Sequence, residues 1–359
     1  MSTTTETMTA SSGKPAVATP IHKDSMKSTW RTDKSQWRTA HHILNWFNAW
    51  ETELDVPVPV HAKTDKVPYL TEGSVHAYIL SHALWPMALQ YAFVKLTGWY
   101  LHPVAAYLLY GLAYKVNAIH AIRIMRRLTH RFGFLDGNQY KRDSVPDQSV
   151  SKVLWSVELT TSVRMFLAVF LAYKRELPHF SWWLPVELAL YSVVLDFFFY
   201  TYHRCCHEIP QLWQYHRTHH LTKHPVPLLS SYADAEQEFI EIALIPLLTY
   251  LTLKSFGLPM NFYDWFLCQE YIIFSETFGH SGLRVYYTVA CIASPLLRLL
   301  NMDLVTEDHD LHHRKGWKKA HNYGKQTRVW DRIFGSCTDR IEFDDKNVDF
   351  GERIDFPLW

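Results

Sequence analysis

The sequence lacks the features that mark several common classes of protein. Its 359 residues carry 36 Lys and Arg against 35 Asp and Glu, so the net charge is +1 and no nucleic-acid partner is expected. The five cysteines are odd in number and form no CxxC pair, which excludes a secreted disulfide scaffold. No nucleotide-binding glycine loop is present. Residues 1–20 are polar and lack the apolar core of a signal peptide, so we expect membrane targeting to come from internal segments.

Apolar residues and histidine are abundant by contrast. Hydrophobic residues make up 48% of the chain and aromatic residues 15%, which excludes a mainly disordered protein and is enough for a large core. Of the 21 histidines, eight fall in three short clusters. Core packing alone does not require that concentration, so metal binding is the leading hypothesis.

Composition divides the chain into four segments. Residues 1–70 are expected to be a flexible polar tail, because the first 40 are rich in Ser, Thr and Lys and the prolines of residues 54–68 forbid a continuous helix. We expect residues 71–189 to form a transmembrane helical scaffold, and residues 190–337 contain the histidine clusters. Residues 338–359 are expected to be an acidic C-terminal tail.

Long apolar runs predict membrane helices. Four of them reach the length of about 20 residues that a bilayer crossing requires, namely residues 76–96, 99–122, 153–173 and 180–202. The last two runs contain charges and can span only if these face the bundle interior: Glu158, Arg164, Glu187 and Asp196. Residues 239–256 and 262–278 form a shorter apolar pair, as in a hairpin that enters the membrane and returns. The predicted fold is all-α, a polytopic membrane bundle of about four transmembrane helices plus a hairpin.

The distribution of basic residues orients this bundle. The loop after the second run carries Arg123, Arg126, Arg127 and further basic residues, the excess that is typical of a cytoplasmic loop. Because the runs come in pairs, all histidine clusters then lie on the cytoplasmic side, where we expect a His-rich helical cap. A water-soluble helical protein with buried core helices is the alternative.

The three clusters have the spacing of metal ligands. His203 and His207 form HxxxH, and two HxxHH clusters follow at residues 216–220 and 309–313. On a helix, positions three and four apart share a face, so each HxxHH cluster can direct its three rings to one side and serve two adjacent metals. One zinc ion needs only about three protein ligands, so two metal ions fit better. Among the metals that accept imidazole, iron also performs oxygen chemistry.

Residues outside the clusters carry a resemblance to a known family. Residues 190–337 contain the three His boxes, Gly279-His280-Ser281-Gly282, Asn322-Tyr323-Gly324 and a segment from Trp330 to Gly335. In these features the chain resembles the membrane-bound fatty acid hydroxylase/sterol desaturase superfamily, which implies that residues 190–337 form the catalytic domain. The resemblance implies a non-haem diiron oxidoreductase of the endoplasmic reticulum membrane that uses O2. It also implies electrons from cytochrome b5 and an NAD(P)H reductase, and because no HPGG haem motif is present, a separate donor protein is expected.

The same resemblance implies which residues bind the metals. The expected ligands are His203, His207, His216, His219, His220, His280, His309, His312 and His313. Structural roles are expected for His224 and His321, and Cys205 and Cys206 are expected to point away from the metals. Asp196, seven residues before His203, could accept the second ring N–H of a ligand, and Asn322 is expected beside the ligands as well.

The reaction expected from such a site is oxidation of an unactivated C–H bond. The substrate is a lipid, a sterol or another hydrophobic metabolite, because apolar helices lead to the site. Hydroxylation is favoured, and C–C desaturation by the same ligand set is the alternative. A His-rich metal transporter is the alternative from another class, although its ligands should lie near mid-span rather than after the spans. A zinc metalloprotease is disfavoured, since His207-Glu208 is followed by Gln211 where HExxH requires histidine.

Overall fold

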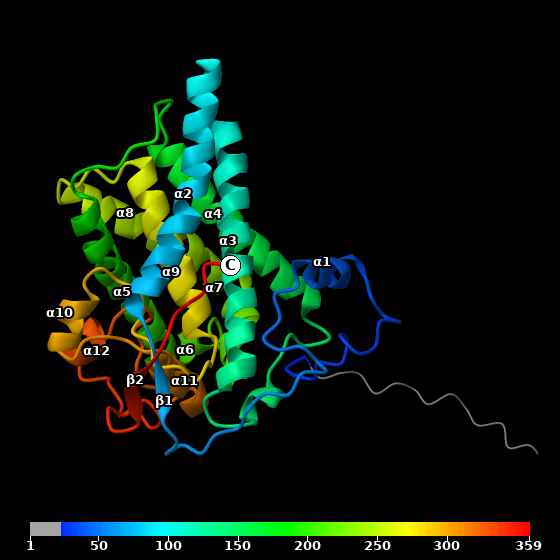
Figure 1. Cartoon of the computed structure of the whole chain (residues 1–359). Helices are drawn as coiled ribbons and strands as arrows, with labels where there is room; N and C mark the ends of the chain where they lie inside the picture. Colours follow the sequence, from blue (N-terminus) through cyan, green and yellow to red (C-terminus); the bar gives the residue numbers. More distant parts are fainter. Residues whose placement is uncertain (1–22) are drawn as a thin grey trace, which may run out of the picture.

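The computed structural model describes residues 23–359 and is mainly helical (Figure 1). Its elements in chain order are α1 (Thr39–Phe47), β1 (Val67–Leu70), α2 (Glu72–Thr97), α3 (Pro103–Phe132), a 3-10 turn (Gln139–Arg142), α4 (Val150–Ala172), α5 (Leu184–Glu208), α6 (Pro210–Trp213), two 3-10 turns (His219–Leu221 and Pro227–Ser231), α7 (Ala235–Phe239), a π turn (Ile240–Leu244), α8 (Ile245–Ser255), α9 (Phe262–Gly279), α10 (Ser294–Leu299), α11 (Thr306–Lys315), α12 (Val329–Ile333) and β2 (Val348–Ile354).

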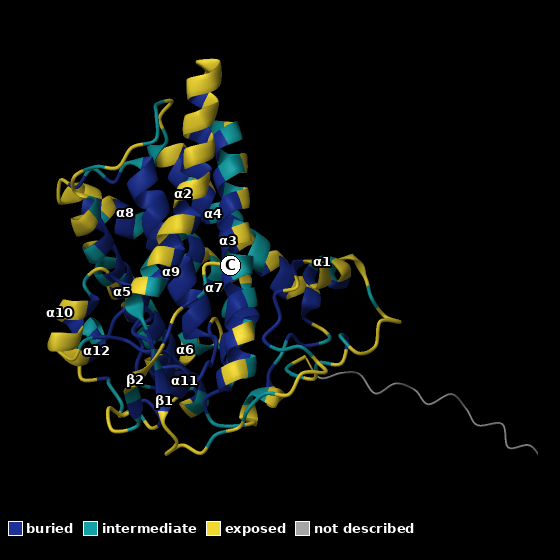
Figure 2. Ribbon diagram, viewed as in Figure 1, coloured by how far each residue is buried: buried dark blue, intermediate teal, exposed yellow. Residues whose placement is uncertain are grey.

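Helix α9 is the centre of the bundle. Every residue of α9 is buried, because α2, α3, α4 and α5 pack around it (Figure 2). Asn261 begins the helix by accepting hydrogen bonds from the backbone N–H groups of Tyr263 and Asp264 at 2.8 and 3.0 Å. The expected turn between residues 256 and 262 joins α8 to α9. Helix α9, the second arm of the predicted hairpin, is enclosed by other helices of the protein. Sequence periodicity does not distinguish such a core helix from a helix that enters the membrane.

Two of the described helices, α4 and α5, combine the length and apolar composition needed to cross a bilayer. Helices α2 and α3 have the length without the composition, so the four-span topology stays a prediction. The expectation that charges inside these runs face the interior is confirmed for Arg164, Glu187 and Asp196, which are all buried. Arg164 forms an ion pair with Glu276 of α9 at 2.9 Å.

The N-terminal segment is packed where a flexible tail was predicted. Within residues 23–70, α1 forms, and Trp30 and Trp50 are buried with exposed fractions of 4% each. The indole N–H of Trp30 donates to the carbonyl of Val145 at 3.0 Å. The prediction is therefore wrong for this part, because aromatic anchors outweigh the polar composition around them. The remainder of the predicted tail, residues 1–22, lies outside the described residues.

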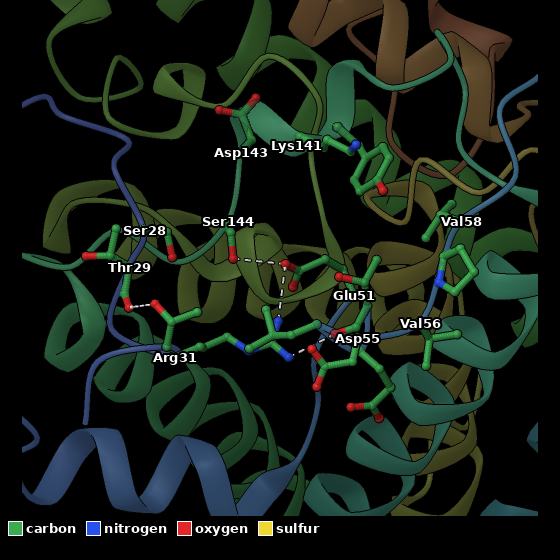
Figure 3. A pocket seen from close by; sticks show the side chains of 16 residues that line it. Ser28, Thr29, Arg31, Glu51, Asp55, Val56, Val58, Lys141, Asp143 and Ser144 are labelled. Atoms are coloured by element: carbon green, nitrogen blue, oxygen red, sulfur yellow. Dashed lines mark hydrogen bonds and ion pairs between the residues drawn. The ribbon is translucent and has the colours of Figure 1, made fainter.

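A polar cavity of about 560 Å³ lies where this segment meets the loop after α3 (Figure 3). Buried Glu51 accepts a hydrogen bond from the hydroxyl of Ser144 at 2.9 Å and lies 3.9 Å from the guanidinium of Arg31. On the same loop, Asp143 accepts hydrogen bonds from the backbone N–H groups of Lys223 and His224, each at 2.7 Å. These bonds connect the N-terminal segment to the chain just after the second His box.

The C-terminal segment is also ordered. Strand β2 pairs in parallel with β1, so that Val67 lies opposite Val348 and Leu70 opposite Ile354. Because Phe343 and Phe356 are buried beside this pair, residues 338–359 are part of the body rather than the predicted tail. The bundle is all-α as predicted, and the two-stranded sheet of β1 and β2 was not predicted. Figure 1 shows β1 and β2 together with α6 and α11 at the lower end of the bundle.

Candidate metal centre

Nine buried histidines meet at the lower end of the bundle in two neighbouring groups. Within each group, the candidate ligating nitrogens all lie within 4.8 Å of one another. Group A consists of His203, His207, His216, His220 and His312, and group B consists of His219, His280, His309 and His313. All nine histidines expected from the sequence are thus brought together, including the isolated His280.

The two HxxHH boxes each contribute to both groups. On α11, His309 and His313 are four residues apart and face group B, whereas His312 lies on the adjacent face and joins group A. One box thus contributes rings to two adjacent groups, and metal binding by each group stays a prediction.

The second box differs from its expected helical form. Its residues follow α6 as turns that end in the 3-10 turn His219–Leu221. The backbone N–H of His220 donates to the carbonyl of His216 at 3.4 Å, and both rings join group A. His219, between them in the chain, points to group B. The three rings of the second box are therefore divided between groups A and B without an α-helix.

Backbone carbonyls fix the ring orientation of five of the nine histidines. In each of these five, Nδ1 lies within hydrogen-bond distance of a carbonyl oxygen: His203 with Tyr323 (2.8 Å), His207 with Trp317 (2.9 Å), His312 with His321 (2.7 Å), His313 with Thr222 (3.1 Å) and His280 with Glu276 (2.7 Å). A carbonyl only accepts, so Nδ1 must carry the proton, and Nε2 presents a lone pair. The same arrangement orients histidine ligands in metal sites.

Hydrogen bonds cannot pair all of the ring nitrogens that face each other within each group. In group A, the Nε2 atoms of His207 and His312 both lie 3.0 Å from Nε2 of His220, which can supply only one proton. In group B, Nε2 of His280 lies 2.9 Å from Nε2 of His309 and 3.4 Å from that of His219. One proton can pair only two of the three facing nitrogens in each group, and ring nitrogens that converge in this way fit a cation at each group.

Further nitrogens support this fit. The Nε2 atoms of His203 and His313, and both ring nitrogens of His216, are buried without a hydrogen-bond partner among the described residues. An unpartnered buried polar atom is costly, and coordination to a metal removes that cost. With five and four imidazoles, each group has enough donors for one ion.

Burial keeps these rings in the form that binds metals. Desolvation, together with the neighbouring rings, holds the pKa values of His216, His219, His220, His309, His312 and His313 well below 6.5. The rings are therefore neutral at pH 7 and do not have to lose a proton before they coordinate.

Asp196 contacts a loop rather than a ligand. Its carboxylate accepts hydrogen bonds from the backbone N–H groups of Lys325 (2.7 Å), Gln326 (3.0 Å) and Thr327 (3.2 Å). The predicted bond to a ligand ring is therefore wrong, because the chain returns across this face of α5 and offers three N–H groups. The same loop carries the Tyr323 carbonyl that orients His203, so Asp196 supports the ligand through the loop.

The motif Asn322-Tyr323-Gly324 lies in this loop. The Asn322 side chain donates to the carbonyl of Asp308 and accepts from the N–H of Thr338, both at 3.0 Å, so it joins the loop to α11 without touching a ligand ring. Asp331 accepts from the N–H groups of Tyr323 and Gly324 at 2.9 and 2.7 Å. The loop is thus held by buried carboxylates on both sides.

Acidic residues of α11 fasten the C-terminal segment to the site. Glu307 accepts hydrogen bonds from three backbone N–H groups of residues 341–343, at 2.7 to 3.1 Å. Asp308 forms an ion pair with Arg340 at 2.8 Å, and Asp310 pairs with Arg314. These carboxylates therefore position α11 and do not contact the histidine rings.

The remaining candidates lie outside both groups. His224 lies 3.9 Å from Asp136, and His321 contributes its carbonyl to His312 while Nδ1 of its own ring lies 2.9 Å from the carbonyl of Lys319. Neither Cys205 nor Cys206 belongs to a group, as expected. Sequence reasoning missed the carbonyls of Thr222 and Trp317, since every residue has a carbonyl and its role leaves no signal in the sequence.

Comparison with known proteins identifies the family of this chain. A family model described as "Fatty acid hydroxylase" matches residues 188–336. The fatty acid hydroxylase vlmA of Lecanicillium sp is 41% identical over 314 residues, which cover 83% of this chain and 86% of the relative. The ornithine lipid hydroxylase OlsE of Rhizobium tropici is 25% identical over 157 residues, covering 44% and 43% of the two chains.

A human relative, fatty acid hydroxylase domain-containing protein 2, is 28% identical over 178 residues, 47% of this chain and 46% of its own. No solved structure matches. The similarity to vlmA extends over most of both chains, and the family model covers the segment that contains all nine histidines. The chain therefore belongs to the fatty acid hydroxylase superfamily.

Proposed function

We propose that this protein is a membrane-bound hydroxylase that uses O2 and two iron ions to oxidise an unactivated C–H bond of a lipid. The observation that carries the proposal is the pair of buried histidine groups A and B, joined through His219–His220 and His312–His313. Membership of the hydroxylase family, with relatives that are named hydroxylases, favours hydroxylation over desaturation.

Iron fits this donor set by chemistry. Imidazole suits iron, zinc, copper and nickel, and among these iron performs the O2 chemistry that hydroxylation requires. When bound, an iron pair supplies the reduction of O2 and the oxidising power for hydrogen abstraction. The protein holds the neutral rings in position through the carbonyls of Tyr323, Trp317 and Thr222, and encloses them away from bulk water.

We propose that a separate electron donor docks where group A approaches the protein surface. A cavity of about 520 Å³ reaches His207 and is lined by Arg204, Trp317, Lys318 and His321 among others. The Trp317 ring stacks on that of Trp213 at 5.2 Å, with an angle of 7° between the planes. Glu208 also lines the cavity and pairs with Arg204, which leaves Lys318 as its unpaired charge and suits an acidic electron carrier such as cytochrome b5 with its NAD(P)H reductase.

The proposed location is the endoplasmic reticulum membrane, with the metal centre on the cytoplasmic face. The apolar helices α4 and α5 support membrane insertion, and the basic residues near the end of α3 support this orientation. A metal transporter is disfavoured because both groups are enclosed at the end of the bundle instead of lining a path through it.

The proposal is tested by comparing lipid extracts from cells that express the wild-type chain or its His220→Ala variant, grown with and without oxygen. We expect an O2-dependent product heavier by one oxygen atom in the wild type alone. A product lighter by two hydrogens would replace hydroxylation by desaturation. Metal analysis of the purified wild type is run in parallel, and retained turnover without iron would overturn the proposal.

A further inference from the structure

Two of the backbone carbonyls that orient histidine rings belong to peptide groups with a second, charged partner. A peptide group joins the carbonyl of one residue to the N–H of the next, so hydrogen bonds at its two ends connect two side chains through it. In this structure one such peptide group connects a carboxylate to a ring of group A, and another connects a carboxylate to a ring of group B. We call each connection a relay.

Relay B runs from the loop after α3 to α11. Nδ1 of His313 lies 3.1 Å from the carbonyl of Thr222, and the N–H of the same peptide group, which belongs to Lys223, donates to the Asp143 carboxylate at 2.7 Å. The Thr222 hydroxyl oxygen also lies 3.2 Å from this Nδ1, while the hydroxyl proton goes to the carbonyl of His219 at 2.6 Å. Asp143 thus reaches a ring of group B through a single peptide group.

Relay A has the same form and starts from α12. Nδ1 of His203 lies 2.8 Å from the carbonyl of Tyr323, and the N–H of the same peptide group, which belongs to Gly324, donates to Oδ2 of Asp331 at 2.7 Å. The two relays share no residue and come from distant parts of the chain. Each of the two histidine groups therefore has its own carboxylate behind one ring.

His312 shows that such a connection is not a general property of the orienting carbonyls. Its Nδ1 lies 2.7 Å from the carbonyl of His321. The N–H of that peptide group, which belongs to Asn322, donates to the neutral carbonyl of Ser336 at 2.8 Å. Within group A, one ring is thus connected to a carboxylate and another to an uncharged group.

A carboxylate at one end of a peptide group changes the other end. Its negative charge polarises the peptide, so the carbonyl becomes a stronger acceptor, and the Nε2 atom of the ring that donates to it becomes more basic. Asp143 and Asp331 have exposed fractions of 1% and 0%, so water does not screen this effect at the peptide. Arg142, the ion-pair partner of Asp143, is half-exposed, and its solvated charge offsets the carboxylate only in part.

The rings at the end of the relays are free to use this basicity. Nε2 of His203 and Nε2 of His313 are both buried without a hydrogen-bond partner among the described residues. Each ring therefore has its proton on Nδ1, held by the relay, and an unpaired lone pair on Nε2 that is directed into its group.

We propose that Asp143 and Asp331 are positioning residues that act through these peptide groups to raise the electron donation of His313 and His203. A more electron-rich imidazole favours Fe(III) over Fe(II), because its attraction grows with the charge of the ion. Each relay then lowers the reduction potential of the iron in its own group. This inference rests on the proposed function, since it describes how the chain adjusts the two proposed iron ions.

Reduction potentials of the iron-loaded full-length protein test the relays in Asp143→Asn and Asp331→Asn. The amide oxygen of asparagine still accepts the peptide N–H, so the substitution removes the charge and keeps the bond. We expect each variant to lose about tenfold of the preference for Fe(III) at one of the two irons, which raises that potential by about 59 mV. Because burial raises the pKa of the Asp331 carboxyl, the measurement is made at mildly alkaline pH. Unchanged potentials in the folded variants overturn the proposal, and if Asp331→Asn does not fold, Asp143→Asn decides it alone.

Asp196→Asn is the matched control for charge that acts through space. A Cβ atom at Gly324 would lie 3.0 Å from Oδ2 of Asp196 and 2.9 Å from Oδ2 of Asp331, so both carboxylates are equally close to this residue. Asp331 accepts the N–H of the peptide group that orients His203, whereas Asp196 accepts those of residues 325–327. We expect the potential of Asp196→Asn to stay near that of the wild type. A shift as large as that of Asp331→Asn overturns the route through the peptide.

Zinc binding separates an electronic effect from a displaced ring. Zn²⁺ is titrated into the metal-free protein in competition with a chelator, and we expect Asp143→Asn and Asp331→Asn to weaken binding at one site by less than about tenfold. A displaced ring would weaken Zn²⁺, Fe(II) and Fe(III) alike, so a large loss of zinc affinity with an unchanged potential overturns the proposal. If the potentials shift but no O2-dependent lipid product forms, the proposed function fails and the relays stand; product formation with unshifted potentials gives the reverse.

Discussion

Gly324 lies directly against Asp196. A Cβ atom at position 324 would come within 3.0 Å of the Asp196 Oδ2 atom, and within 2.3 Å of the carbonyl oxygen of Thr327. Only glycine leaves room for the loop to wrap around this carboxylate, and the carbonyl of the preceding residue, Tyr323, orients His203. Backbone packing at this point is therefore connected to the geometry of group A.

Replacing Gly324 by alanine should displace the loop and release His203. We expect a destabilisation of about 1–3 kcal/mol, typical of overpacking, and less metal bound per protein. Thermal unfolding and metal analysis measure the two effects. Gly111→Ala is the matched control, because nothing lies within 4 Å of a Cβ there and alanine favours a helix interior. Full metal content in Gly324→Ala would contradict this account of the loop.

His220 and His321 provide a contrasting pair. The Nε2 atom of His220 lies 3.0 Å from two other ligand nitrogens, so His220→Ala should abolish metal binding by group A together with turnover. His321 contributes only its backbone carbonyl to the site, which alanine retains. We therefore expect His321→Ala to keep its metal content. Equal metal loss in both variants would show that the His321 ring has a role this structure does not assign.

Removal of metal should make stability dependent on pH. The buried histidines have folded pKa values well below 6.5, as for His216 and His312, so the unfolded chain binds more protons at mildly acidic pH. Stability of the metal-free protein should then fall as pH decreases through about 6.5, by up to about 1.4 kcal/mol per pH unit for each proton taken up. Urea unfolding of metal-stripped protein at several pH values measures this slope. A flat profile between about pH 7.5 and about pH 5.5 would contradict neutral rings in the folded state.

Arg340 should be important for stability although it touches no ligand. Its partner Asp308 is fully buried, and without Arg340 this carboxylate keeps only the longer ion pair with Arg328 at 3.6 Å. We expect Arg340→Ala to destabilise the protein by about 3 kcal/mol. Arg353→Ala in the exposed part of β2 is the control, and should change stability by less than about 0.5 kcal/mol. Similar unfolding midpoints for the two variants would refute this role.

The gathering of the histidines could be predicted from sequence. The spacing of the three boxes and their resemblance to a known family indicated all nine histidines that the structure brings together, among them His280, which has no histidine neighbour. The division of ligands between the groups could not be foreseen at residues 216–220, since it depends on turns rather than on a helix. The backbone carbonyls that orient the histidine rings could not be predicted either, because every residue has a carbonyl whatever its environment.

Tertiary packing accounts for the errors in the fold. Trp30 and Trp50 occur in polar surroundings, and only their pocket beside the loop after α3 shows that they anchor residues 23–70. Helix α9 carries Asp264, Glu270 and Glu276 and lacks the apolar composition of α4 and α5, yet the helices around it bury all of its residues. In both cases the deciding interactions come from residues far away in sequence.

The pairing of Val67 with Val348 has a consequence for biosynthesis. These strands are about 280 residues apart, so closing the sheet costs more chain entropy than any helix–helix contact between sequence neighbours and is expected late in folding. Residues 341–343, which hold Glu307 at the start of α11, lie just before the second strand. During translation the third His box therefore gains its support only after nearly all described residues have left the ribosome, and a ribosome-bound chain stalled before residue 341 should be unable to retain both metals.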